Sequence, residues 1–284
     1  MHGAAALSPD AASPQRVGTR DAEPEEAACV PLSVCVMACN DERVIARCLE
    51  SVSWAAEIVV AVDSASRDAT GDIARRLATR VEVHRYAGDI EQKRYVAGLA
   101  RFAWILSIDS DEVVSDRLGA EIRALFVAGE PALVGYEVNR IAYHLGRWIR
   151  HGDWHPDWKL RLFAARAVRF EGDNPHGRAA VDGRVGRLPG ALEHYSFRDL
   201  ADQMQRIQVH TGQAADALFA KGRRARVLDV TVRPLARVLR SYVLRRGFLD
   251  GVPGLIVAGS IGFSVFLKYA KLWERQRGHA ARRL

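Results

Sequence analysis

Strand-like and helix-like segments alternate at short intervals from residue 32 to residue 108 of this 284-residue chain. Strand-like segments occupy 32–38, 57–62, 81–86 and 104–108, and all of them except 81–86 are apolar over most of their length. The segments between them that carry apolar residues at helical spacing occupy 41–52, 70–78 and 90–100. Continuous apolar strands indicate a sheet covered on both faces, and strands joined through helices favour right-handed crossovers. We therefore expect an α/β fold with a mostly parallel sheet flanked by helices.

The predicted strands end in polar residues. Asn40 follows the first strand, Asp63 the second and Asp109 the fourth. The carboxyl ends of parallel strands lie at one edge of a sheet, where open α/β sheets bind their ligands. We expect these three side chains to converge on one crevice, and Asn40 or Asp41 to act as the N-cap of the first helix.

The fourth strand runs into an acidic stretch, Asp-Ser-Asp-Glu at residues 109–112. Asp109 and Asp111 provide hard oxygen ligands at a spacing that can direct both at one Mg²⁺ or Mn²⁺ ion. The alternative is a solvated acidic turn that caps the next helix through Ser115 or Asp116. The polar residues at the ends of the upstream strands favour the metal site.

Other common nucleotide sites have no motif in this chain. No Gly-x-Gly-x-x-Gly follows the first strand and no Walker-type glycine-lysine loop occurs, which disfavours NAD binding and P-loop chemistry. Residues 1–30 are rich in Ala, Pro, Asp and Glu and lack an apolar signal-peptide core, so we expect a disordered leader.

Positive charge is concentrated near the C-terminus. The chain has a formal net charge of +7, and residues 221–284 contain 15 Lys and Arg against three acids. An apolar segment, 248–272, lies within this basic region and is interrupted by Asp250. We expect a membrane-surface helix or helical hairpin attracted to anionic lipid. The alternative is a helix packed on the rest of the protein or on a second subunit. Nucleic-acid binding is disfavoured because the charges flank an apolar core.

Several motifs together resemble the inverting family 2 glycosyltransferases, which have a GT-A-type fold. Within that family the chain looks most like the bacterial lipopolysaccharide core β-1,4-glucosyltransferase branch. The motifs are Asn40-Asp41-Glu42, Arg47-Cys48-Leu49-Glu50-Ser51-Val52, 57–70, Gln92-Lys93-Arg94 and 108–112. The resemblance implies a glycosyltransferase domain at 31–200, with a nucleotide-sugar half at 31–115 and an acceptor half at 116–200. A basic helical region at 201–284 would follow it.

The resemblance also assigns roles to the polar residues at the sheet edge. The first acidic loop contacts the nucleotide base, and the Asp-x-Asp pair holds the ribose and the metal that bridges the diphosphate. Lys93 is expected to add a positive charge near the same phosphates. The nucleotide-sugar site is thus expected at Ala38, Asn40, Asp41, Asp63, Lys93 and Asp109, and the Mg²⁺ or Mn²⁺ site at Asp109 and Asp111.

The acceptor site is expected in the half of the domain that is dense in aromatic and polar residues. Trp154, Trp158 and Arg161 are its predicted acceptor-binding residues, although aromatic residues in such a segment can equally be core. Inversion at the anomeric carbon needs a general base to deprotonate the acceptor hydroxyl.

The resemblance leaves that general base open. Related enzymes have a His-Glu pair at this point, whereas here Gly177 stands where the Glu is expected. The candidates are Asp173, then His176, then Asp157 and Asp153.

The predicted function is transfer of a hexose such as glucose from a nucleoside diphosphate sugar, with UDP favoured, to a lipid-linked saccharide. The acceptor would be the lipopolysaccharide core, at the cytoplasmic face of the cell membrane. The alternatives are a transferase for capsule, exopolysaccharide or another glycan, and a non-catalytic nucleotide-sugar-binding scaffold.

Overall fold

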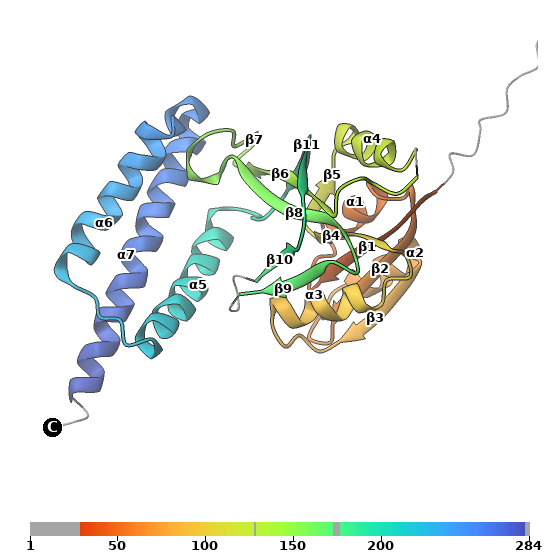
Figure 1. The fold of residues 1–284 in the computed structure, drawn as a ribbon. Coiled ribbons are helices and arrows are strands. Elements are labelled where there is room, and N and C mark those ends of the chain that lie inside the picture. Colours follow the sequence, from red (N-terminus) through yellow and green to blue (C-terminus); the bar gives the residue numbers. More distant parts are fainter. Residues whose placement is uncertain (1–28, 128, 173–176, 282–284) are drawn as a thin grey trace, which may run out of the picture.

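The computed structural model describes residues 29–127, 129–172 and 177–281 of the chain. In this part of the chain a nine-stranded sheet has the order β3-β2-β1-β4-β8-β6-β11-β5, with β7 paired to β6. A separate two-stranded sheet pairs β10 with β9. The large sheet forms one side of the molecule and three long C-terminal helices form the other (Figure 1).

The first four strands are parallel and confirm the predicted half of the sheet. They are β1 (Val30–Ala38), β2 (Ala55–Asp63), β3 (Arg80–His84) and β4 (Trp104–Asp109). The helices that connect or follow them are α1 (Ile45–Glu50), α2 (Thr70–Leu77), α3 (Asp89–Gly98) and α4 (Asp116–Leu125). Parallel pairing of β1 with both β2 and β4 brings the carboxyl ends of three strands to one edge.

The second half of the sheet is mixed. Its strands are β5 (Glu112–Val114), β6 (Gly135–His144), β7 (Arg147–Trp148), β8 (Asp157–Ala164) and β11 (Val185–His194). The two strands of the small sheet are β9 (Val168–Glu171) and β10 (Arg178–Val181). Strand β8 runs antiparallel to β4, which joins the two halves, and β5 runs antiparallel to β11.

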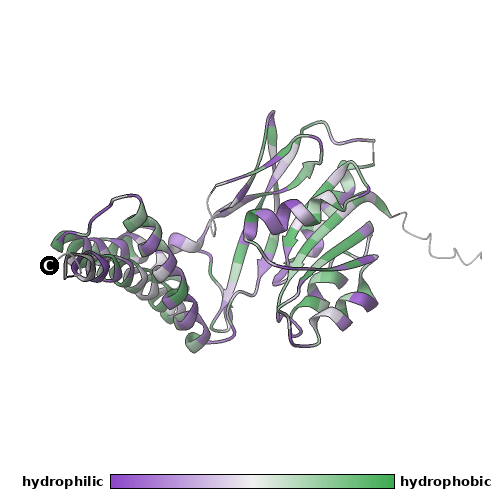
Figure 2. Cartoon of the chain, turned by 90° about the horizontal axis from the view of Figure 1, so that it is seen from below, coloured by the Kyte–Doolittle hydropathy of each residue, from purple (hydrophilic) through white to green (hydrophobic). Residues whose placement is uncertain are grey.

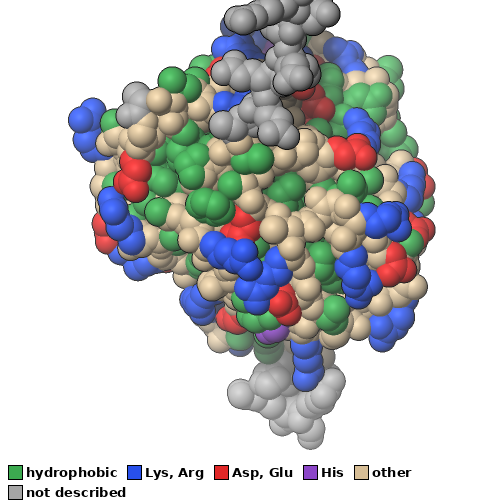
Figure 3. All heavy atoms as spheres, turned by 90° about the vertical axis from the view of Figure 1, so that its right-hand side faces the viewer, with side chains coloured by type: hydrophobic (Ala, Val, Ile, Leu, Met, Phe, Trp, Pro, Cys, Tyr) green, Lys and Arg blue, Asp and Glu red, His purple; other side chains and the backbone are tan. Residues whose placement is uncertain are grey.

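The hydrophobic core has two layers, one on each face of the large sheet. One face is covered by α1, α2 and α4, which contribute Ile45, Ala74 and Leu118. The opposite face is covered by α3 and the small sheet, with Val96 and Phe170 in contact with the sheet. Strands β1, β2 and β4 are correspondingly apolar along most of their length, and Figure 2 shows green strands on the side away from the helical body. The face turned away from the C-terminal helices mixes cationic, acidic and apolar side chains (Figure 3).

The C-terminal helices form a second body in which α7 lies between α5 and α6 (Figure 1). Their bounds are α5 (Leu200–Ala220), α6 (Val227–Leu239) and α7 (Gly251–Ala281). Shorter helical turns are η1 (Gly152–Trp154), η2 (Arg240–Leu244) and η3 (Gly247–Asp250). The segment Gly247–Gly278 is long and apolar enough to cross a membrane, and 33% of its apolar 18-residue stretch is buried in the protein.

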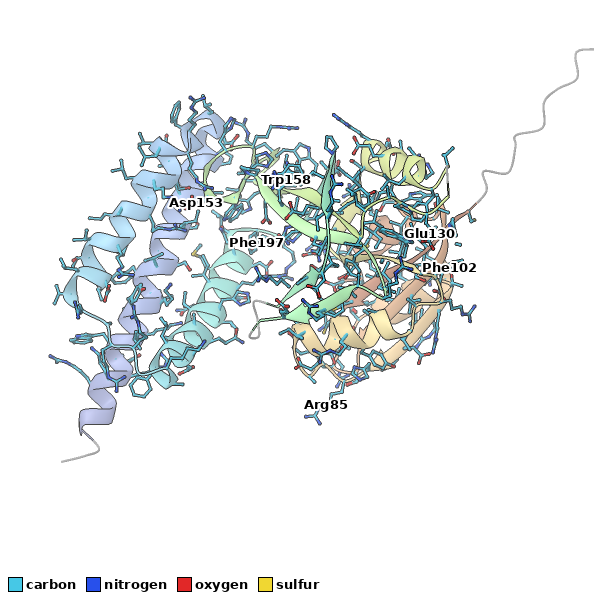
Figure 4. All side chains as sticks on the ribbon, in the orientation of Figure 1. Arg85, Phe102, Glu130, Asp153, Trp158 and Phe197 are labelled. Carbon is cyan, nitrogen blue, oxygen red and sulfur yellow. The ribbon has the colours of Figure 1, made fainter. Side chains whose placement is uncertain are left out.

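Two buried carboxylates join the helical body to the sheet body. Asp250, at 1% exposed, accepts hydrogen bonds from the backbone N–H groups of Arg150 (3.0 Å) and His151 (2.8 Å). Asp153, which Figure 4 places at the junction, forms ion pairs with three arginines of the helical body. These are Arg237 at 3.1 Å, Arg245 at 3.3 Å and Arg240 at 3.4 Å.

Helices α6 and α7 also expose apolar side chains at helical spacing. The exposed residues are Leu228, Val232, Leu235 and Leu239 on α6, and Val252, Leu255, Phe263 and Phe266 on α7. Residues three and four apart lie on one side of a helix, so each set forms a stripe. We call these two stripes the apolar face of the helical body.

Candidate active site

The carboxyl ends of β1, β2 and β4 open into a cavity of about 930 Å³, which we call the donor cavity. Asn40, Asp63 and Asp109 all line it, so their predicted convergence is confirmed. Ala38, Asp41 and Asp111 line the same cavity. Lys93 lies in a neighbouring cavity that shares Asp109 with the first.

The first loop is held by hydrogen bonds between polar side chains and backbone N–H groups. Asn40 adopts a left-handed backbone with φ 56°, and its side-chain oxygen accepts from the N–H of Arg67 at 2.8 Å. Asp63 accepts from the N–H groups of Ala65 at 3.0 Å and Tyr86 at 3.3 Å. Burial raises the pKa of Asp63, but these hydrogen bonds outweigh it and hold the pKa below its ordinary value. Asp63 is therefore a carboxylate at neutral pH.

The predicted N-cap of the first helix is wrong. Helix α1 begins at Ile45 with Val44 as its N-cap and without a side-chain cap. The Asp41 carboxylate instead accepts from the N–H of Cys39 at 2.8 Å and from the hydroxyl of Ser110 at 2.6 Å. This contact ties the end of β1 to the acidic stretch after β4, and burial raises the pKa of Asp41.

The acidic stretch is not a solvated turn. Glu112 is fully buried, begins β5, and accepts a hydrogen bond from the backbone N–H of Asp109 at 3.0 Å. The capping part of the alternative prediction holds, because Ser115 is the N-cap of α4 and accepts from the N–H of Leu118. The three carboxylates of the stretch therefore have different environments.

Asp109 is held by two cations. Arg161, whose side chain is 7% exposed, donates to Asp109 at 2.8 Å and also contacts Glu112. The ammonium of Lys93 lies 3.6 Å from the other oxygen of Asp109. Burial alone would raise the pKa of Asp109, but Arg161 and Lys93 hold it well below its ordinary value. The side chain of Arg161 is thus occupied by two carboxylates, and its predicted acceptor role stays a prediction.

Asp111 pairs with a histidine that the sequence did not suggest as a ligand. His194 is the last residue of β11, and the antiparallel register sets it opposite Glu112 of β5. Its Nε2 atom lies 3.4 Å from an oxygen of Asp111, with both side chains partly exposed to the donor cavity.

The Asp111 and His194 pair fits a divalent cation. Two ligand atoms that each lie about 2.1 Å from one metal ion are about 3.0–3.4 Å apart, as this nitrogen and oxygen are. Among the described residues no third His, Cys, Asp or Glu completes a cluster with them, so substrate oxygens and water would supply the remaining ligands. Asp109, the other predicted metal ligand, is engaged by cations.

Arginines from distant parts of the sequence complete the donor cavity. Arg47 of α1 donates to the hydroxyl of Tyr195 at 3.0 Å and lies 4.4 Å from the centre of its ring. Arg198 and Arg206 reach the cavity from the start of α5, where both pair with Asp202. Arg47 belongs to one of the family motifs but had no predicted role, and sequence reasoning missed Arg198 and Arg206 because no local motif marks them.

The predicted acceptor residues lie in two further cavities. Trp158 lines a cavity of about 1110 Å³, which we call the second cavity and which meets the donor cavity at Asp89 and Asp109. Trp154 lines a smaller cavity of about 320 Å³, where its ring stacks at 5.8 Å on Phe197. Figure 4 labels Trp158 and Phe197 on the side of the sheet that is turned towards the helical body.

The general base candidates differ in what the structure describes. Asp173 and His176 lie outside the described residues. Asp157 pairs with Arg140 at 2.8 Å and Lys159 at 3.0 Å. Burial raises the pKa of Asp157, but the two cations outweigh it and lower the pKa, which weakens this carboxylate as a proton acceptor. Asp153 is buried among its three arginines.

Comparison with known proteins identifies the family. Residues 33–181, more than half of the chain, match the family described as Glycosyl transferase family 2. The chain belongs to this family. The mixed, mostly parallel sheet of this glycosyltransferase is the GT-A-like arrangement that the sequence motifs predicted.

The glycosyltransferase has curated relatives along most of its length. It is 26% identical to the lipopolysaccharide core biosynthesis glycosyltransferase LpsC of Rhizobium meliloti, covering 87% of this chain and 93% of the relative. It is 25% identical to an uncharacterized glycosyltransferase of Rickettsia typhi, covering 86% and 87% of the two chains.

Solved structures resemble the glycosyltransferase more distantly. The mannosyltransferase PcManGT of Pyrobaculum calidifontis, in complex with GDP-Man and Mn²⁺, gives a TM-score of 0.48 at 16% identity over 90% of each chain. TarS of S. aureus gives a TM-score of 0.43 at 14% identity, covering 87% of this chain and 91% of that one.

Proposed function

We propose that this glycosyltransferase transfers a hexose from a nucleoside diphosphate sugar to a lipid-linked saccharide of the lipopolysaccharide core, with inversion at the anomeric carbon. The observation that carries the proposal is the Asp111 and His194 pair, which faces an acid-rich cavity at the carboxyl edge of the sheet. The similarity to LpsC supports the lipopolysaccharide core as the acceptor.

The nucleotide would bind along the first loop. Asp63 stays ionised and can accept from the N–H of a uracil or a guanine, and UDP is the carrier that we favour. Ala38, Asn40 and Asp41 form the wall of the cavity beside it. Asp109, fixed by Arg161 and Lys93, would orient the ribose or the sugar at the junction of the two cavities.

The diphosphate would lie between the metal ligands and the arginines. Asp111 and His194 would hold Mg²⁺ or Mn²⁺, which would stabilise the negative charge that develops on the leaving nucleoside diphosphate. Arg47, Arg198 and Arg206 face the same cavity and would add fixed positive charge to that group.

The acceptor hydroxyl must approach from the side opposite to the leaving diphosphate, which here is the side of the second cavity. We assign its deprotonation to the candidates in the order Asp173, His176 and Asp157. Trp154 and Trp158 would bind saccharide rings beside that approach, and the acceptor role of Arg161 would be to keep Asp109 in place.

The helical body would hold the enzyme at the cytoplasmic face of the membrane. Its apolar face carries side chains that are 41–71% exposed, from Phe266 to Leu235, and the helices that form it are rich in arginine and lysine. Helices α5 and α6 flank α7 along its length, so a spanning α7 would have to carry their polar side chains into the bilayer (Figure 2). Binding at the surface of an anionic membrane would bury the apolar face and keep the polar side chains of α5 and α6 in water.

Titration calorimetry of nucleoside diphosphates tests the donor site. The full chain is titrated with UDP, GDP and ADP, with and without Mn²⁺, together with Asp111→Ala and the matched control Asp116→Ala on the surface of α4. We expect one nucleotide to bind in a metal-dependent manner, and that binding to be lost in Asp111→Ala alone. No binding of any nucleotide to folded parent protein would refute the proposal.

A further inference from the structure

The two cavities that meet at Asp109 carry opposite charge. Acidic residues outnumber cationic ones by eight to four in the lining of the donor cavity. In the second cavity cationic residues outnumber acidic ones by six to three. The six cations are Lys93, Arg140, Lys159, Arg161, Arg178 and Arg187.

The positive charge extends into the depth of the second cavity. Lys93 and Arg140 have side chains only 15% and 23% exposed, and Arg161 is buried. These three cations share two carboxylates, those of Asp109 and Glu112. Asp157 pairs with both Arg140 and Lys159 at the rim. Together, the four cations Lys93, Arg140, Lys159 and Arg161 therefore face three carboxylates, those of Asp109, Glu112 and Asp157. The Nε atom of Arg161 is buried and has no hydrogen-bond partner among the described residues.

The rim of the second cavity provides accessible cations. Lys159 and Arg187 have side chains 43% and 61% exposed. Arg187 pairs with Glu137 of the cavity lining, whereas Lys159 pairs with Asp157, which lines the smaller cavity of Trp154. The guanidinium of Arg187 lies 4.7 Å from the centre of the Trp158 ring, which fixes its plane beside the cavity. A fixed guanidinium beside an ammonium suits a phosphate or carboxylate, and the neighbouring indole suits a saccharide.

We propose that the second cavity is an acceptor subsite for a saccharide that bears a phosphate or carboxylate group, recognised by Lys159 and Arg187 beside Trp158. This inference rests on the proposed function, because it takes the second cavity as the acceptor side. The donor diphosphate does not account for the charge, since the donor cavity has arginines and a cation site of its own.

Calorimetry with small saccharides tests the subsite on the full chain saturated with UDP and Mn²⁺. The probes are glucose, glucose 6-phosphate, glucuronate and inorganic phosphate. The variants are the double substitution Lys159→Gln with Arg187→Gln, and Arg117→Gln as a matched control. Arg117 is an exposed arginine that pairs with Glu121 and lines neither of the two cavities.

We expect glucose 6-phosphate or glucuronate to bind more tightly than glucose, and the double variant to lose about 10-fold in that affinity while Arg117→Gln keeps it. Equal binding of glucose and the charged sugars would overturn the proposal, as would parent-like binding in the double variant. It would also fail if inorganic phosphate bound as tightly as the sugar phosphate. UDP titration of the same proteins separates the two hypotheses, because failure of the proposed function would abolish UDP binding to the parent itself.

Discussion

The donor cavity and the second cavity share Asp89 and Asp109 but differ in how their charge is balanced. The donor cavity has an acidic lining and the Asp111 and His194 pair, so under the proposed function an anionic substrate would bind there together with a divalent cation. The second cavity already has an excess of arginine and lysine. The difference suggests one way to separate two anionic partners: the donor diphosphate would bind through a metal ion, and the acceptor would bind to fixed cationic side chains.

Loss of the metal ligand should give the largest effect. In Asp111→Ala we expect kcat/KM for the donor to fall by about 1000-fold, because the leaving diphosphate loses the charge stabilisation that depends on this carboxylate. Steady-state kinetics at several Mn²⁺ concentrations measures it. The assignment of the metal ion to the donor cavity would be wrong if Asp111→Ala kept metal-dependent activity while Lys159→Gln lost it.

Removal of the central arginine should mainly lower stability. Arg161→Met leaves the buried carboxylate of Glu112 and the partly buried carboxylate of Asp109 without their closest cation, which we expect to cost about 3 kcal/mol in the free energy of unfolding. Urea denaturation measures this cost. Arg178→Met is the matched control, since that arginine is 77% exposed and its nearest carboxylate is 3.8 Å away. Equal stability of the two variants would contradict the central role of Arg161.

Lys93 connects the charge of the two cavities and should have an intermediate effect. We expect Lys93→Met to raise the donor KM by about 10-fold, because Asp109 loses one of the two cations that position it. Kinetics with the donor varied measures it, with Arg94→Met as the neighbouring control. An effect on the acceptor KM alone would place Lys93 in the second cavity's function.

Asp41 should give the smallest effect, visible as a dependence of stability on pH. Burial raises its folded pKa above the ordinary value of 3.8, with Asp111 adding to the rise and Arg206 opposing it. The proton is therefore held more tightly in the folded state, so the stability that protonated Asp41 contributes is lost as pH rises through the folded pKa. Relative to the parent, Asp41→Asn should gain on the order of 2 °C in Tm as pH rises from 3.8 to 7.

Thermal unfolding of the two proteins across this pH range measures the difference. Asp72→Asn serves as a control, because that carboxylate is exposed on α2. A pH-independent difference between Asp41→Asn and the parent would show that burial of Asp41 does not set its pKa.

The sequence predicted the donor half of the site better than the rest. Continuous apolar strands indicate a parallel sheet, and polar residues at their carboxyl ends then lie at one edge of it. Asn40, Asp63 and Asp109 could therefore be placed together from the sequence. His194 could not, because its proximity to Asp111 depends on β11 pairing antiparallel with the three-residue strand β5. Too few residues make up β5 for a periodic pattern to reveal it.

Charge partners were equally hidden from sequence reasoning. Arg161 was predicted to bind the acceptor because it lies in an aromatic segment, yet its contacts are with Asp109 and Glu112, about 50 residues earlier in the chain. The same reasoning misplaced the helix cap, since Asp41 finds its partner in Ser110 across the sheet edge. Pairs that form through the tertiary fold leave no local pattern.

The buried carboxylates Asp250 and Asp153 fix the angle between the sheet body and the helical body. Ion pairs and hydrogen bonds oppose changes at this junction, so the open edge of the sheet would stand at a set height above a surface on which α6 and α7 rested. Such an enzyme would select its acceptors by their length above the surface. If α6 and α7 rest on the membrane as proposed, the enzyme would extend glycans whose growing end reaches that height.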